Sequence, residues 1–229
     1  MVRGVFSAFY EYNWDAAEEH FAKALEMDPA SPMVRVGRAL WFLLPTLRLA
    51  EALDEIRRAV TLDPFSSAVR TAELWILHTM KKVEAADRAR ALIQLFPLLP
   101  ICRFAAGLTL LRRDSIEEAV VTLEEGLQIV PGDVFLLGVL ALARGRQGRA
   151  AEAEQIRAGL EEQAGKRYIP FLPRAYGAEA CGDIDLAYEL LGQAVDGREP
   201  LAVITLADRR NDSTSHPYCH SLLSKMNLA

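Results

Sequence analysis

Small apolar residues return along the chain at a nearly constant interval, each inside a stretch whose apolar positions follow the period of an α-helix. In "YNWDAAEEHFAKALEMDP", residues 12–29, alanines fall on one helical face and a proline ends the pattern. Equivalent alanines follow at spacings of 35, 34, 33, 34 and 34 residues: Ala17, Ala52, Ala86, Ala119, Ala153 and Ala187. The pattern predicts six copies of one helical element.

A second series of small residues runs about thirteen positions ahead of the first, from the second copy onward: Ala39, Ala72, Gly107, Ala141 and Ala175. Turn residues such as those in "RQGR" and "CGDI" separate the two series, and Ser115 with Glu118 predicts a capping box. Most copies end at a helix breaker: Pro29, Pro64, Pro97, Pro131 and Gly165. Each copy, called a repeat below, is therefore predicted to be helix, short turn, helix, break.

This periodicity resembles that of the tetratricopeptide repeat (TPR) family, whose repeats are helix–turn–helix elements of 34 residues. The resemblance covers roughly residues 1–198 and rests on six copies in register. It implies an all-α fold, a right-handed superhelix of about six helix pairs. Two copies depart from the pattern: Arg90 stands where a bulky apolar residue is usual, and "LPTLRL" replaces the usual turn glycine.

The two ends of the sequence lead to different predictions. The first repeat has only about ten residues before Glu11 and no clear small partner for Ala17, so its first helix is expected to be cut short, as in a fragment of a longer polypeptide. Residues 199–229 are predicted to form a loop and a capping helix, because a terminal repeat has no following neighbour. That helix would place Tyr218, Leu222, Leu223 and Met226 on one side.

A narrower resemblance is carried by "YEYNWDAAEEHFAKALEMDP", "YIPFLPRAYGAEACGDIDLAYELLGQAV" and "HPYCHSLLSKMNL". These segments are similar to the C-terminal TPR regions of large bacterial signalling proteins. In those proteins the repeats follow a winged-helix DNA-binding domain, a Ser/Thr protein kinase or a nucleotide cyclase. In that family an arginine-rich segment usually precedes the last helix. This sequence keeps its arginines at Arg209 and Arg210 and its proline at Pro217, but has Tyr218 and Cys219 where the family pattern has Arg and Phe.

In the TPR family the first helix of each repeat lines the concave surface. Projecting the first helices inward gives a mainly apolar groove suited to an amphipathic helix or an extended peptide. The predicted groove residues are Val69, Glu73, Ile101, Phe104, Leu108, Arg112, Phe135, Leu142, Tyr176 and Glu179. The alternative is that several of them fill the packing between repeats and that the chain's own tail covers what remains. A clamp for acidic C-termini is not expected, because only Arg112 among these positions is a cation.

Composition narrows the range of partners. The net charge of -5 argues against a nucleic-acid surface, which needs clustered Lys and Arg. The chain has no apolar run long enough to span a membrane and no pattern of a signal peptide, so a cytoplasmic location is expected. Three cysteines without a CxxC pair suggest a reducing compartment, and Cys102 and Cys181 are expected to be small buried hydrophobes.

Chemistry-bearing clusters are few. The sequence has no GxGxxG, P-loop, GxSxG or HExxH motif. His216, Cys219 and His220 lack the fourth ligand of a structural zinc site, and His20 and His78 are interpreted as surface or groove-edge histidines. We therefore expect no enzymatic activity, no metal and no cofactor. Two hypotheses remain: a scaffold that binds a protein or peptide, or a self-assembly module in which the first repeat or the terminal helix meets another copy.

Overall fold

The computed structural model describes residues 1–211 and 217–229. Every regular element in these ranges is helical. The chain divides into two compact units: unit 1 comprises Met1–Val83 and Arg198–Ala229, and unit 2 comprises Glu84–Gly197. The first and last segments of the sequence thus belong to the same unit.

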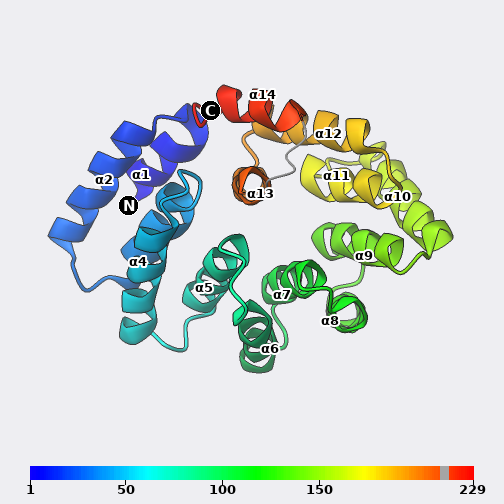
Figure 1. Cartoon of the computed structure of the whole chain (residues 1–229), viewed down its shortest axis with the longest axis horizontal. Helices are drawn as coiled ribbons and strands as arrows, with labels where there is room; N and C mark the ends of the chain where they lie inside the picture. The colour runs from blue at the N-terminus through cyan, green and yellow to red at the C-terminus, as the bar shows by residue number, and fades with distance from the viewer. Residues whose placement is uncertain (212–216) are drawn as a thin grey trace. The chain divides into compact units, whose positions relative to one another are not determined.

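Unit 1 contains two complete helix pairs, the first helix of a third pair and two C-terminal helices (Figure 1). In the first two pairs the opening helix continues into a π-helical segment, η1 or η2. The elements are α1 Val2–Phe6, η1 Ser7–Glu11, α2 Trp14–Met27, α3 Pro32–Arg38, η2 Ala39–Leu43, α4 Leu49–Leu62, α5 Ser67–Thr79, α13 Pro200–Arg210 and α14 Pro217–Lys225.

Unit 2 is a continuous run of seven helices, α6 to α12 (Figure 1). Each helix contacts the next, and the first helices α7, α9 and α11 also contact one another in turn. The elements are α6 Ala85–Leu95, α7 Pro100–Arg112, α8 Ile116–Ile129, α9 Val134–Arg146, α10 Ala150–Ala164, α11 Phe171–Ala180 and α12 Ile184–Asp196.

The turn inside each of the six repeats places one residue in the left-handed region, where glycine is favoured. Only two of these residues are glycine; Leu47 takes that conformation in "LPTLRL" with φ 57°. The left-handed residues follow the spacing of the alanine series: Tyr12, Leu47, Lys81, Asp114, Gly148 and Gly182. A repeat therefore keeps its turn geometry where the sequence has lost the glycine.

Side-chain caps start several helices, as the turn composition predicts. The Asn13, Ser31, Ser66, Asp133 and Asp183 side chains each accept a hydrogen bond from a first-turn backbone N–H. The predicted capping box is wrong, because the side chain of Ser115 caps nothing. Its expected partner, Glu118, is bound instead by Arg90.

Gly4 is the small partner of Ala17 that the sequence left unassigned. A Cβ at Gly4 would lie 2.9 Å from Cδ2 of Phe21, so only glycine lets the first helix approach α2 this closely. Residues 2–11 thus supply an opening helix for the first repeat.

Glycines let α9 and α11 of unit 2 approach each other closely. A Cβ at Gly138 would lie 2.8 Å from the carbonyl oxygen of Pro173, and one at Gly145 would lie 2.6 Å from that of Ala180. Both obstacles are backbone atoms, which cannot rotate away. Two glycines one heptad apart therefore let the backbones of α9 and α11 touch.

The C-terminal segment differs from its prediction in two ways. Residues 200–210, for which the sequence predicted no helix, form α13, with Pro200 at the first helical position, where its missing N–H costs nothing. Leu222 and Leu223 of α14 and the following Met226 are buried as expected, and so is Cys219, but Tyr218 is exposed.

Hydrogen bonds tie this segment to the first repeats within unit 1. The indole N–H of Trp14 donates to the carbonyl of Met226 at 2.7 Å, and the amide of Asn227 donates to the carbonyl of Tyr12 at 3.0 Å. The guanidinium carbon of Arg198 lies 4.0 Å from the ring centre of Tyr12. The C-terminal helices are therefore part of the fold of the N-terminal repeats.

Candidate functional site

The predicted groove residues of unit 1 are buried. Val69 and Glu73 lie on α5, whose side chains are buried without interruption from Thr71 to Thr79. The end of α5 is bound by α13: the amide of Asn211 donates to the carbonyl of Thr79 at 2.6 Å, and His78 lies 3.5 Å from Asp208. His78 is therefore a buried residue, not a groove-edge one as expected from the sequence. Here the chain's own tail contacts the first helix.

The predicted groove residues of unit 2 divide into a buried and an accessible group. Phe104 and Tyr176 are buried, and Phe104 makes an edge-to-face contact with Phe135 at 5.6 Å between ring centres. Ile101 is 46% exposed at the start of α7. The others are half-buried: Leu108, Arg112, Phe135, Leu142 and Glu179.

Leu108 and Leu142 occupy the same position in consecutive repeats, on the neighbouring helices α7 and α9. Both stay half-buried in the folded unit, whereas the next copy of that position is the buried Tyr176. We call Ile101, Leu108, Phe135 and Leu142 the α7–α9 face. It is apolar, with Arg112 one helical turn beyond Leu108.

Arginines that tie one repeat to the break before it were missed by the sequence reasoning. Arg35, Arg70 and Arg103 each donate to the carbonyl of the proline six residues earlier, at 2.6, 2.9 and 2.9 Å. The signal is a Pro-x5-Arg spacing in three successive repeats, which has no counterpart after Pro131, where Leu137 stands.

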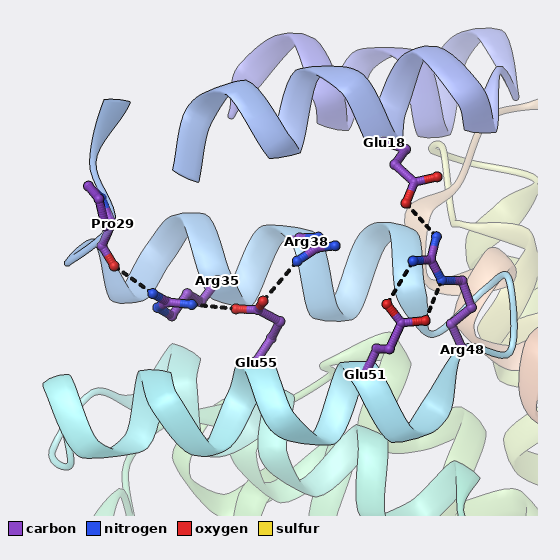
Figure 2. Close-up of polar contacts among 7 residues, drawn as sticks. All are labelled: Glu18, Pro29, Arg35, Arg38, Arg48, Glu51 and Glu55. Atoms are coloured by element: carbon purple, nitrogen blue, oxygen red, sulfur yellow. Dashed lines mark hydrogen bonds and ion pairs between the residues drawn. The ribbon is translucent and has the colours of Figure 1, made fainter. Parts of the chain in front are cut away.

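Figure 2 shows two ion-pair clusters between the helices of the first two repeats. Glu55 of α4 accepts from Arg35 at 2.6 Å and from Arg38 at 2.8 Å. Beside them, Arg48 donates to Glu18 of α2 and to Glu51. Hydrogen bonding to Arg48 lowers the pKa of Glu51. The carboxylates of both clusters are paired with arginines of the same fold, so we interpret the clusters as structural.

The seam between second helices changes its charge pattern from one repeat to the next. Arg90 of α6 binds Glu118 of α8 through two hydrogen bonds of 2.8 Å, which lowers the pKa of Glu118. One period later the corresponding residues are both acidic, Glu124 and Glu152. Arg144 of α9, at a position that is Leu110 in the preceding repeat, pairs with both of them. A buried guanidinium thus prevents two carboxylates from facing each other.

Next to Arg144 lies a cavity of about 420 Å³ bounded by α8, α9 and α10. Its lining combines aliphatic side chains with carboxylates and amides, as ligand-binding cavities do. The lining residues are Glu124, Leu137, Leu140, Arg144, Glu152, Gln155, Ile156, Gly159 and Gln163. None of them was predicted as a binding residue.

An apolar stripe lies on the outside of the opening helix. Val2, Phe6 and Tyr10 are 76%, 50% and 59% exposed, and the rings of Phe6 and Tyr10 stack at 5.2 Å. Their spacing of four residues places them on one helical face. We call them the N-terminal stripe.

The cysteines and histidines form no metal centre in residues 1–211 and 217–229, where no three His, Cys, Asp or Glu side chains converge. His216 lies outside these ranges. Cys102 is buried, as expected, but Cys181 is exposed at the end of α11. Burial raises the pKa of Cys219. Within the same ranges, no helix is long and apolar enough to cross a membrane.

No protein-family model matches the sequence, and no curated protein is significantly similar to it. Solved structures do resemble it. PilW, a type IV pilus biogenesis factor, is 18% identical with a TM-score of 0.59 over 88% of this chain and 94% of its own. A tetratricopeptide repeat protein from Parabacteroides merdae is 16% identical with a TM-score of 0.59 over 97% of both chains.

A chain of the APC/C assembly Cut9–Hcn1 gives a TM-score of 0.63 at 12% identity, over 97% of this chain and 48% of its own. At such identities the likeness concerns architecture alone. It agrees with the helix pairs and the 34-residue register of this chain. The predicted fold class is thus confirmed: the chain has the all-α helical-repeat fold of tetratricopeptide repeat proteins.

Proposed function

We propose that the protein is a protein-interaction scaffold that binds an apolar segment of a partner on the α7–α9 face. The observation that carries the proposal is the pair Leu108 and Leu142. They repeat on neighbouring first helices and keep part of their apolar surface exposed, beside the exposed Ile101. Side chains three or four residues apart on a partner helix can reach such paired positions.

The same proposal makes the chain a regulatory module of a bacterial signalling or transcriptional regulator, working in the cytoplasm without catalytic activity of its own. Its support is the sequence resemblance of the segments around Trp14, Tyr168 and Tyr218 to the repeat regions of such regulators. The reading frame upstream of Met1 tests this part: it should encode a winged-helix, kinase or cyclase domain. An unrelated frame there would remove the regulatory role and leave the scaffold.

Peptide selection tests the binding face. Peptides enriched from a displayed library on the wild-type chain should lose binding when Leu108 and Leu142 are both changed to Asp. The control is Val121→Asp, an exposed valine on the second helix α8. Phe104 is unsuitable as a test position because it is buried, and a charge there would disturb folding. The proposal fails if no peptide is enriched, or if enriched peptides bind both variants equally.

A second candidate function is self-association through the N-terminal stripe. Three exposed apolar side chains on one helical face, two of them stacked aromatics, favour it. Light scattering over a range of concentrations should show a dimer that Phe6→Glu converts to a monomer. A chain that is monomeric at every concentration would rule this function out.

A further inference from the structure

The cavity beside Arg144 arises where the repeat pattern loses an internal ion pair. In repeat 4, the fourth helix pair along the chain, formed by α7 and α8, Arg103 of α7 is buried. It donates to Glu125 at 2.8 Å, to the carbonyl of Pro97 at 2.9 Å and to that of Thr122 at 3.2 Å. One period of 34 residues later, Arg103 corresponds to Leu137 and Glu125 to Gly159. Both replacements line the cavity.

The cavity occupies the position that an arginine side chain fills in the preceding repeat. Arg103 fills the hairpin of α7 and α8 with its aliphatic stem and delivers its guanidinium to a carboxylate. In the hairpin of α9 and α10, Leu137 and Gly159 leave that space to solvent, and a Cβ on Gly159 would meet no atom within 4 Å. Thr122 corresponds to Ile156, so the wall has become more apolar.

The walls of the cavity offer acceptors to an incoming cation. Glu124 and Glu152 share one buried guanidinium, that of Arg144, and their side chains are 45% and 41% exposed. Arg149 also pairs with Glu152, but at the exposed rim. Gln155 adds an amide oxygen, whereas the amide oxygen of Gln163 already accepts from Arg167 at 2.6 Å. Both oxygens of Glu152 are paired with arginine, whereas Glu124 is paired through Oε1, so its half-exposed carboxylate can accept from a further cation with an apolar stem. The planar guanidinium suits carboxylate and amide acceptors best.

We propose that this cavity is a docking site for an arginine side chain of a protein partner, which replaces the internal arginine that repeat 5 lacks. The site uses side chains of α9 other than those of the α7–α9 face, and it does not rest on the function proposed for that face. The partner chemistry is an exposed arginine with small or aliphatic neighbours, because the lining around Leu137, Leu140 and Ile156 is aliphatic.

The probe is the blocked peptide Ac-Ala-Leu-Arg-Leu-Ala-NH2, followed through backbone amide shifts of the full chain by NMR. Saturable shifts should appear in α9 and α10, with a weak dissociation constant of about 1 mM for so short a contact. The same peptide with citrulline in place of arginine keeps the shape and removes the charge. It should bind at least about tenfold more weakly.

The decisive variant is Leu137→Arg with Gly159→Glu, which rebuilds the ion pair of repeat 4 and fills the cavity from within. It should keep its circular dichroism and lose the peptide. If this variant does not fold, Gln155→Arg at the exposed wall decides, compared with Ala158→Arg on the same helix but outside the lining. Binding should fall with Gln155→Arg and stay with Ala158→Arg.

Three results would overturn the proposal: no saturable shift, equal binding of the citrulline peptide, or binding that survives the cavity variants. The change of Leu108 and Leu142 to Asp should leave arginine binding intact. Failure of the arginine site and failure of the α7–α9 face are therefore distinguishable.

Discussion

Unit 1 and unit 2 are built from the same helix pairs, but their first helices have different surroundings. In unit 1, α5 is buried without interruption from Thr71 to Thr79, and its end is hydrogen-bonded to Asn211, the residue after α13. In unit 2, α7 and α9 keep Ile101 exposed and Leu108 and Leu142 half-buried. First helices built on the same repeat therefore differ in accessibility, and non-repeated elements such as α13 contribute to that difference.

Removal of the tail should have the largest effect, and it should be confined to unit 1. A chain that ends at Gly197 loses α13 and α14, including the buried Leu222, Leu223 and Met226, which together stabilise the fold by roughly 5 kcal/mol. Hydrogen exchange should show lost protection in residues 1–83 and retained protection in 84–197. Equal loss in both units would contradict the division, and Ser224→Ala on the exposed side of α14 is the control.

The glycines of α9 provide the next largest effect. Gly138→Ala and Gly145→Ala should each destabilise unit 2 by about 2–3 kcal/mol, because the new Cβ meets backbone atoms of α11. Gly159→Ala on α10 meets nothing and should stabilise by up to about 1 kcal/mol through helix propensity. Urea denaturation measures all three. The close approach of α9 and α11 would be refuted if the three substitutions had the same sign.

Turn strain comes third. Leu47→Gly should stabilise the chain by about 0.5–1 kcal/mol, since the left-handed strain removed exceeds the backbone entropy that glycine adds. Gly148→Ala is the reciprocal change: its φ is +75° with open space around it, so it should destabilise by about 1 kcal/mol through the backbone alone. Thermal unfolding of the two variants should shift in opposite directions, and a stabilising Gly148→Ala would contradict the shared turn geometry.

The ion pair of Arg90 and Glu118 should contribute least. Both side chains are about two-fifths exposed, so Arg90→Leu should cost less than about 1 kcal/mol at neutral pH. The pKa of Glu118 is lowered in the folded chain, so the stabilisation is present above the ordinary carboxyl pKa and is lost as the pH falls through the lowered one. The stability difference between wild type and variant should therefore shrink in acid. If the stability difference between wild type and Arg90→Leu did not change with pH, it would arise from packing and not from the ion pair.

Most of the fold could be predicted from the repeat period of the sequence. Six helix pairs and their breaks followed from alanine spacing, because stacked helices need small residues where they meet. The helix α13 was missed because Pro200 was interpreted as a break, although proline is compatible with the first helical position. Gly4 was missed because glycine is a poor helix former, and its reason to be there is Phe21, seventeen residues away.

The candidate sites were less predictable. Helical periodicity marks which side of α7 faces a neighbour, but it does not distinguish the buried Phe104 from the half-buried Leu108. The cavity beside Arg144 depends on comparing repeats with one another, since Leu137 and Gly159 are unremarkable until set beside Arg103 and Glu125. Aligning the repeats by charge as well as by small residues would have exposed it.

Carbene footprinting with a library-selected peptide tests the central claim most directly. In the free chain, Ile101, Leu108 and Leu142 should be labelled and Val69 of α5 should not. The bound peptide should protect Leu108 and Leu142 while Val121 on α8 stays labelled. Labelling of Val69 as strong as that of Leu108, or peptide protection that spares both leucines, would contradict the assignment of the binding surface to the α7–α9 face.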